Sequence, residues 1–216
     1  MTSSGNNWKI GSGEQWSFLN GPWQDVADSE LAPRDGFEIE YRAVRHDAVY
    51  ADFRASFRFK FRSCGGGARL LFRVQDTHRF YALDIPINGQ QARSRHFWAG
   101  LVVADGGPLQ RYLNFALVPG LCARIDHWYD ATVEASGSRL RAWINDIAVA
   151  DVQDSTFASG RLGLAAIGLP YGETCRFASL QVDGTQADAT PWPGLQAPEP
   201  YWITPCPEPE PETFQS

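Results

Sequence analysis

The sequence lacks the patterns that mark several large classes of protein. No apolar run approaches the roughly 20 residues that a membrane-spanning helix needs. No stretch keeps a helical apolar period over three turns, so we expect no long amphipathic helix. The chain also has no Gly-x-Ser-x-Gly motif, no P-loop and no dinucleotide-binding fingerprint. No catalytic motif that remains is specific enough to name a reaction.

The chain also lacks an excess of positive charge, since its formal net charge is -6 at pH 7. A general nucleic-acid binder gains its affinity by neutralising phosphates, so this balance argues against one. The N-terminal residues Met-Thr-Ser-Ser-Gly-Asn-Asn contain no signal-peptide core. We expect either a cytoplasmic protein or one whose leader peptide was removed, and an extracellular or periplasmic location is favoured in the second case.

Metal-ligand spacing is also missing. The four histidines form no HxH or HxxxH pair. The four cysteines form no CxxC pair, and their spacings resemble no zinc site. An even number of cysteines permits two disulfides, whose pairing the sequence leaves open. These cysteines are Cys64, Cys122, Cys175 and Cys206.

Aromatic residues, in contrast, are abundant, with eight Trp, seven Tyr and thirteen Phe. In the stretch 50–62 every odd-numbered residue is Ala or Phe, and most even-numbered residues are charged. Because the side chains of a strand alternate between its faces, this pattern predicts one long β-strand with an aromatic and a cationic face. Such a strand belongs to an antiparallel sheet that is packed on one side and wet on the other.

Similar apolar stretches, separated by Gly, Pro and Asn turn signals, recur along the chain. The expected strands are 37–44, 68–75, 80–87, 97–104, 111–118, 128–135, 139–144, 147–152, 162–167 and 175–182. Residues 1–36 indicate loops with one or two short strands. We predict an all-β, antiparallel β-sandwich of the jelly-roll kind over residues 1–186. Residues 187–216 are rich in Pro and Glu and indicate a strap or linker.

The landmarks of the chain follow a recognisable order. They are strand 50–62 with its Gly-rich turn, Leu71-Phe72-Arg73, Asp76 with Arg79-Phe80-Tyr81, Trp128, the Gly137 and Asn145-Asp146 turns, Gly160-Arg161-Leu162-Gly163-Leu164, Phe177 and Val182. Over about residues 14–184 this order resembles the concanavalin A-like jelly-roll domains of bacterial glycoside-active enzymes. Relatives include laminin-G-like modules, fructan-binding modules and the 3-keto-disaccharide hydrolase type. The resemblance implies two curved sheets that bind carbohydrate on the concave face or at the loops of one edge.

The sequence departs from the catalytic patterns of that superfamily. Laminarinase-like glycosidases carry Glu-x-Asp-x-x-Glu, whereas the nearest string here, Glu38-Ile39-Glu40, lacks the third carboxylate. The 3-keto-disaccharide hydrolase type has a Gly-Tyr-Glu signature where this chain has Phe80-Tyr81-Ala82. We therefore favour a binding domain over an enzyme. If the protein is a glycoside hydrolase or lyase, its acid and base candidates are Asp84, His96, Glu38 and Glu40.

A sugar site needs polar groups for the hydroxyls and an aromatic ring for the apolar sugar face. Arg73 lies in an apolar stretch and needs a partner, for which Asp84 is the natural candidate. Trp98 shares a strand face with His96, and it forms either a ligand platform or a contact with a loop. The candidate ligand-binding residues are Arg73, Gln75, Tyr81, Asp84, Arg95, His96, Trp98, Tyr112 and Asn114.

We expect a carbohydrate-binding jelly-roll domain that serves as a module of, or partner to, a polysaccharide-active enzyme. One alternative is a glycoside hydrolase or lyase on the same fold. The other is a laminin-G-like protein-interaction domain, which predicts an exposed apolar patch and no sugar affinity. No cofactor is required. A structural calcium ion suits this fold, with Asp25, Asp28 and Asp183 as candidate ligands.

Overall fold

A computed structural model describes residues 16–20, 23–27, 30–33, 40–87, 96–107, 109–168, 174–187 and 191–195, with only the backbone described at 25–27. These residues form fourteen β-strands. The strands are β1 (Trp16–Leu19), β2 (Trp23–Ala27), β3 (Glu30–Pro33), β4 (Glu40–Arg45), β5 (Val49–Phe61), β6 (Gly66–Val74), β7 (Arg79–Ile87), β8 (Trp98–Asp105), β9 (Arg111–Leu117), β10 (Trp128–Ser136), β11 (Arg139–Ile144), β12 (Ile147–Gln153), β13 (Arg161–Gly168) and β14 (Cys175–Ala187).

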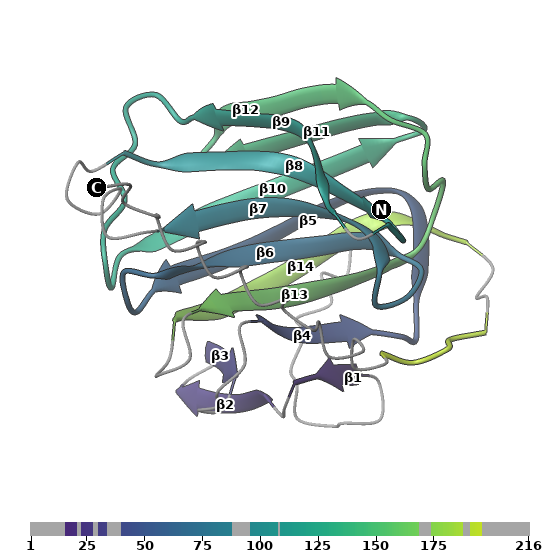
Figure 1. Cartoon of the computed structure of the whole chain (residues 1–216), viewed down its shortest axis with the longest axis horizontal. Helices are drawn as coiled ribbons and strands as arrows, with labels where there is room; N and C mark the ends of the chain where they lie inside the picture. Colours follow the sequence, from purple (N-terminus) through teal and green to yellow (C-terminus); the bar gives the residue numbers. More distant parts are fainter. Residues whose placement is uncertain are drawn as a thin grey trace, which may run out of the picture.

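The strands make two seven-stranded antiparallel sheets that pack face to face. Sheet A has the order β1-β4-β13-β6-β7-β8-β9, and sheet B has the order β12-β11-β10-β5-β14-β3-β2. Figure 1 shows the two sheets one behind the other, with sheet A in front. The predicted all-β antiparallel sandwich is therefore confirmed. The described residues include no helix with the length and apolarity to cross a lipid bilayer.

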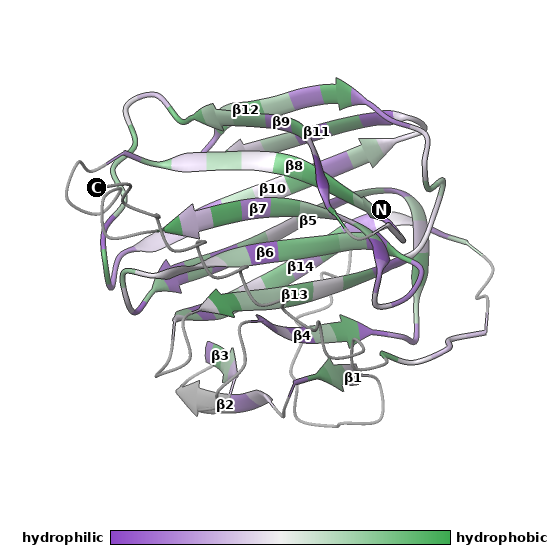
Figure 2. Ribbon diagram, in the orientation of Figure 1, coloured by the Kyte–Doolittle hydropathy of each residue, from purple (hydrophilic) through white to green (hydrophobic). Residues whose placement is uncertain are grey.

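The core lies between the sheets and depends on the alternation within β5. Phe57, Phe59 and Phe61 are at most 1% exposed. The ring of Phe59 stacks on Tyr129 of β10 with centroids 5.5 Å apart, and Phe61 meets Phe97 at 6.1 Å. Burying each phenylalanine stabilises the fold by roughly 1.5–3 kcal/mol. The charged residues of β5 point the other way, and Figure 2 shows this change of hydropathy along the strands.

Two tight hairpins join β10, β11 and β12, the three strands at one edge of sheet B. The β10–β11 turn contains Gly137 with φ 56°, and the β11–β12 turn contains Asn145 and Asp146 with φ 46° and 64°. Two-residue hairpins favour positive φ at their central positions, and Asn, Asp and Gly adopt it at least cost. Both turns lie where the sequence predicted them.

The N-terminal strands differ from the expectation of one or two short strands in residues 1–36. Three strands of four or five residues form there. β1 pairs with β4 at the edge of sheet A, while β3 pairs with β14 and β2 with β3 at the edge of sheet B. Segments this short are too brief to show a clear alternation, so only pairing with longer strands defines them.

The cysteines do not form the two disulfides that their number permits. Cys64, Cys122 and Cys175 form no disulfide with one another, and Cys206 lies outside the described residues. Cys64 is exposed in a turn, whereas Cys175 is buried and its Sγ lies 3.5 Å from the Gly67 carbonyl oxygen. The described part of the sandwich is thus held by packing and hydrogen bonds.

Candidate functional site

Polar side chains from several strands meet on the outer face of sheet A, which is turned away from sheet B. The residues opposite one another in register form one line across the sheet: Arg42 (β4), Ala165 (β13), Arg69 (β6), Asp84 (β7), Gly100 (β8) and Phe115 (β9). Residues opposite in register share a face. Glu40 lies two residues before Arg42 on the same face. We call Glu40, Arg42, Arg69 and Asp84 the polar row.

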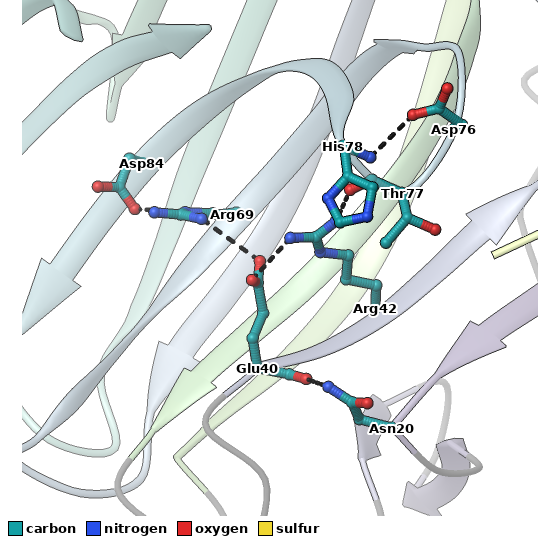
Figure 3. A network of polar contacts seen from close by, with 8 residues as sticks. All are labelled: Asn20, Glu40, Arg42, Arg69, Asp76, Thr77, His78 and Asp84. Carbon is teal, nitrogen blue, oxygen red and sulfur yellow. Dashed lines mark hydrogen bonds and ion pairs between the residues drawn. The ribbon is translucent and has the colours of Figure 1, made fainter. Parts of the chain in front are cut away.

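Ion pairs connect the polar row from β4 to β7 (Figure 3). Arg69 Nε donates to Asp84 Oδ1 at 2.7 Å, and its Nη1 donates to Glu40 Oε1 at 3.3 Å. Arg42 Nη2 donates to Glu40 Oε2 at 2.8 Å, and its Nη1 donates to the carbonyl oxygen of Thr77. Glu40 therefore bridges two arginines, and Arg69 bridges two carboxylates.

A small residue on β13, Ala165, lies beside the ion pair between Arg69 and Glu40. Arg69 and Glu40 belong to strands that are separated by β13, and neighbouring strands lie roughly 5 Å apart. On β13, Ala165 lies opposite Arg69 and also opposite Arg42, so only a methyl group lies beside Arg69 where its side chain crosses β13 toward Glu40. The side chains of Asp84 and Arg69 are only 3% and 11% exposed. Charges this buried need partners, and the ion pairs supply them.

The ion pairs also shift the pKa of Glu40. Burial on its own would raise the pKa of this carboxyl group. Attraction and hydrogen bonding from Arg42, and then from Arg69, outweigh burial and hold the pKa below its usual range. Glu40 is therefore a carboxylate at neutral pH.

Aromatic side chains continue the line beyond Asp84. The Tyr112 hydroxyl donates to Asp84 Oδ2 at 2.5 Å. Its ring meets Phe115 with centroids 4.8 Å apart, and Phe115 stacks on Trp98 at 5.6 Å. Tyr112 is 48% exposed and Phe115 is 40% exposed. We call these three residues the ring platform. It presents apolar surface to solvent directly beside the charges of the polar row.

A β-bulge decides which residues of β9 join the ring platform. The register between β8 and β9 shifts at Leu101 and Val102, so Tyr112 and Phe115 come to the same face. The sequence pattern predicts that Tyr112 and Asn114 lie on the same face of the strand, and this prediction is wrong. Asn114 lies opposite the inward-facing Leu101, and its Oδ1 is buried. Alternation by two fails wherever a bulge adds a residue.

Tyr112 is a poor proton donor at neutral pH. Burial, followed by the hydrogen bond to the Asp84 carboxylate, raises the pKa of Tyr112 to about 12. General acid and base catalysis works best with groups that titrate near the working pH. The pKa values of Glu40 and Tyr112 both move away from neutrality. This part of the site is therefore suited to hydrogen bonding with a ligand more than to moving protons.

Arg73 does not pair with Asp84, contrary to the expectation. The β6–β7 register places Asp84 opposite Arg69, four residues earlier. Arg73 adopts φ 47°, and its guanidinium turns inward, where it is 1% exposed. It donates to the carbonyl oxygens of Ala51, Gly137 and Phe157, each at 2.8 Å. Arg73 ties three chain segments together and lies away from the polar row.

Two further ligand candidates also have structural contacts instead of a place on this face. Tyr81 is fully buried between the sheets, and its hydroxyl donates to Asp154 Oδ1. Gln75 Nε2 donates to the carbonyl oxygens of Arg73 and Ser159. The ligand role predicted for Tyr81 and Gln75 is therefore not supported by their positions.

The remaining sequence candidates are placed as follows. His96 is exposed and comes two residues before Trp98. Glu38, Arg95 and Asp28 lie outside the described residues, as does the side chain of Asp25. Asp183 is exposed on β14 in sheet B, opposite Arg54. Among the residues that the structure describes, no group of three His, Cys, Asp or Glu side chains converges as a metal site would require.

Sequence reasoning brought Asp84, Glu40, Tyr112 and Trp98 into consideration, and the structure places all four on or beside one face. It missed Arg69, Arg42 and Phe115. Arg69 carried a usable signal, because it is a charged residue between Ala68 and Leu70 in an apolar part of its strand. Arg42 and Phe115 gave no such signal, since only the sheet order places them in line with Asp84.

A family model connects this geometry to known proteins. The model for the 3-keto-alpha-glucoside-1,2-lyase-like domain matches residues 3–183. The chain belongs to this family. The resemblance to concanavalin A-like domains, including the 3-keto-disaccharide hydrolase type, is thereby confirmed. No curated protein sequence matches the chain significantly.

Solved structures show the same fold at low sequence identity. The carbohydrate-binding module CBM66 from Bacillus subtilis has a TM-score of 0.62 and 20% identity, over 79% of this chain and 96% of that one. The exoplasmic/lumenal domain of VIP36, in a form bound to Ca2+ and Man3GlcNAc, has a TM-score of 0.61 and 15% identity, over 83% and 88%. A Bacillus subtilis protein of unknown function with a galectin-like fold has a TM-score of 0.59 and 13% identity, over 79% and 90%.

Proposed function

We propose that this protein binds a carbohydrate on the outer face of sheet A, as a module of or partner to a polysaccharide-active enzyme. The observation that carries the proposal is the contact between the polar row and the ring platform. Tyr112 belongs to both, since its hydroxyl bonds Asp84 while its ring touches Phe115. Buried charges and exposed aromatic rings thus lie side by side on one surface.

This combination matches the chemistry of a sugar. A pyranose has hydroxyl groups at its edge and C–H groups on its faces. Carboxylate oxygens of Glu40 and Asp84 accept hydrogen bonds from hydroxyls, and guanidinium N–H groups donate to them. Phe115 and Tyr112 offer exposed rings on which the apolar sugar face stacks. Two of the similar structures are, by their titles, a carbohydrate-binding module and a domain bound to Man3GlcNAc, which supports the proposal.

A second candidate function is a glycoside hydrolase or lyase on the same surface. The family description names a lyase of 3-keto-alpha-glucosides, and two carboxylates, Glu40 and Asp84, meet on Arg69. Against this candidate stand the shifted pKa values of Glu40 and Tyr112, which leave neither group ready to exchange a proton near neutral pH. Binding without chemistry is therefore the better-supported proposal.

A binding screen with product analysis separates the proposals. The intact protein is titrated with neutral glucans, mannans and fructans, and every mixture is examined for new reducing ends and unsaturated products. Saturable binding without products supports the binding module. Products that the wild type forms and the Asp84→Asn variant does not would overturn the binding module in favour of the enzyme. If the protein shows no binding and forms no products, the protein-interaction alternative is favoured.

The calcium ion stays a proposal with a simple test. Asp25, Asp28 and Asp183 are the candidate ligands, and the VIP36 domain carries Ca2+ in its title. The same titrations with calcium chloride and with EDTA decide it, because a structural ion raises the midpoint of thermal unfolding when it binds. An extracellular or periplasmic location, which suits a polysaccharide ligand, is tested by fractionating cells that produce the protein.

A further inference from the structure

The described segment 191–195 lies on the same outer face of sheet A as the polar row. Trp192 and Leu195 pack against a second apolar cluster, which is separate from the core between the sheets. Every residue of this cluster is at most 5% exposed. Its members are Val44, Leu71, Val74, Phe80, Ala82, Val102, Ala104 and Ala165.

Two polar contacts fix Trp192 in place. Its indole Nε1 donates to Ser17 Oγ on β1 at 2.7 Å. The guanidinium of Arg161, at the start of β13, lies 4.6 Å from the centre of its ring. Arg161 is only 3% exposed, so this cation–π contact is largely shielded from water. Segment 191–195 is therefore docked on the sheet by named contacts on two strands.

The covered cluster borders the polar row on every strand that carries a charge. Val44 follows Arg42 by two residues on β4, Leu71 follows Arg69 on β6, and Ala82 precedes Asp84 on β7. Two residues along a strand span roughly 7 Å. One member of the cluster also touches the polar row directly, because the Arg42 guanidinium lies 4.6 Å from the centre of the Phe80 ring.

We propose that Trp192 and Leu195 are positioning residues of the carbohydrate site, because they hold the cluster against which Arg42 packs. Arg42 in turn holds Glu40, and Glu40 holds Arg69. With Phe80 covered, Arg42 is 7% exposed, and its ion pair with Glu40 is shielded from water. This inference rests on the proposed function and extends the site to the C-terminal part of the chain.

In the alternative arrangement, segment 191–195 occupies surface that a glycan needs. It predicts the opposite change in glycan affinity. Removing its two anchors would then tighten glycan binding. The composition of the cluster beneath the segment argues against this arrangement. Sugars stack on aromatic rings, whereas the cluster is aliphatic except for Phe80, whose ring packs against the Arg42 guanidinium. The exposed rings lie on β9, at the edge of sheet A opposite to β1, where the indole of Trp192 is anchored.

The test uses the full chain with Trp192→Ala and Leu195→Ala combined. We expect maltotriose, cellotriose or mannotriose, whichever binds the wild type, to bind this variant about tenfold more weakly. Trp192→Phe keeps a ring over Arg161 and should retain most of the affinity. Trp143→Ala, which removes a tryptophan from sheet B, is the matched control and should bind normally. Tighter or unchanged binding by the double variant would overturn the proposal.

A measurement without glycan separates this proposal from the proposed function. Glu40 lies on the far side of Arg42 from the covered cluster, so loosening Arg42 removes a partner of Glu40 without uncovering it. NMR titration of the Glu40 carboxyl should therefore show its pKa rising toward the usual range in the double variant. An unchanged titration would overturn the positioning role. If the wild type bound no glycan while the titration shifted, the proposed function would fail and the coupling would stand.

Discussion

The outer faces of the two sheets contain the same kinds of residue and use them differently. On sheet B, Arg54 pairs with Glu134 at 3.2 Å and lies 5.1 Å from the ring centre of Trp143. The arginine side chain of that pair is 53% exposed, whereas Arg69 in its pair with Asp84 on sheet A is 11% exposed. Around Trp143 on sheet B, charges and rings satisfy one another in water. In the polar row and the ring platform of sheet A, the charges are buried and the rings face solvent.

This difference shows that composition does not reveal a binding face. Exposed ion pairs contribute little to stability, because water competes for both partners. Buried pairs have lost that water, so they are sensitive to any change in their surroundings. An exposed ring without a cation over it is free to stack on a ligand. Function therefore follows from burial and sheet order, and the predictions below compare the two faces.

The largest expected effect is on stability. Arg69→Ala leaves Glu40 and Asp84 without a shared partner in a buried position, and should lower the free energy of unfolding by about 3–5 kcal/mol. Arg54→Ala, on the exposed face of sheet B, should lower it by at most about 1 kcal/mol. Urea denaturation of both variants measures the difference. Equal losses would show that the two faces are energetically alike.

The next effect is on glycan affinity. Phe115→Ala removes the central ring of the platform and should weaken binding by about 1–3 kcal/mol, or about fivefold to 150-fold. Its own stability should change little, because the ring is 40% exposed. Trp143→Ala, the matched loss of a ring from sheet B, should leave the affinity unchanged. Isothermal titration with each glycan of the screen checks both variants.

A smaller and more specific effect concerns Tyr112. Its pKa of about 12 lies above the usual value of 10. The stabilisation linked to this phenol is therefore fully present below pH 10 and is lost as the pH rises through 12. The ultraviolet absorbance of wild type minus Tyr112→Phe reports the titration. Asp84→Asn removes the carboxylate and should shift that titration toward pH 10. A Tyr112 that already titrates at 10 in the wild type would contradict the Asp84 contact.

The smallest expected effect is that of Arg58→Ala. Arg58 pairs with Asp130 at 3.2 Å, and the two side chains are 47% and 68% exposed. We expect a change of less than about 1 kcal/mol in unfolding free energy. Thermal unfolding at low and high salt, together with one glycan titration, checks this prediction. A loss of glycan affinity in this variant would place binding on sheet B.

Much of the fold could be predicted, because the alternation of apolar and polar residues in strand 50–62 is unambiguous. Thirteen alternating residues determine which side faces the core, and the hairpins at Gly137 and Asn145-Asp146 follow from turn chemistry. The site was harder to predict, because it depends on which strands become neighbours. Glu40 and Arg69 are 29 residues apart in the chain. They meet because β13, from much later in the chain, pairs with both of their strands and so brings β4 and β6 into one sheet.

Local irregularities account for the other errors. Strict alternation predicts Arg73 on the outer, ligand-facing side of its strand, but its positive φ turns the side chain into the sandwich. Strict alternation also predicts Asn114 beside Tyr112, but the bulge in the β8–β9 pairing places Phe115 there instead. Both are departures from strict alternation, and a period of two has no means to anticipate them.

The central claim is that carbohydrate binds the outer face of sheet A. Hydrogen–deuterium exchange of the intact protein, with and without a saturating concentration of the tightest glycan in the screen, tests it most directly. We predict slower exchange in β7, β8 and β9 around Asp84, Gly100 and Phe115, and no change in β10 and β11. Protection confined to β10 and β11, or to neither face, would contradict the claim.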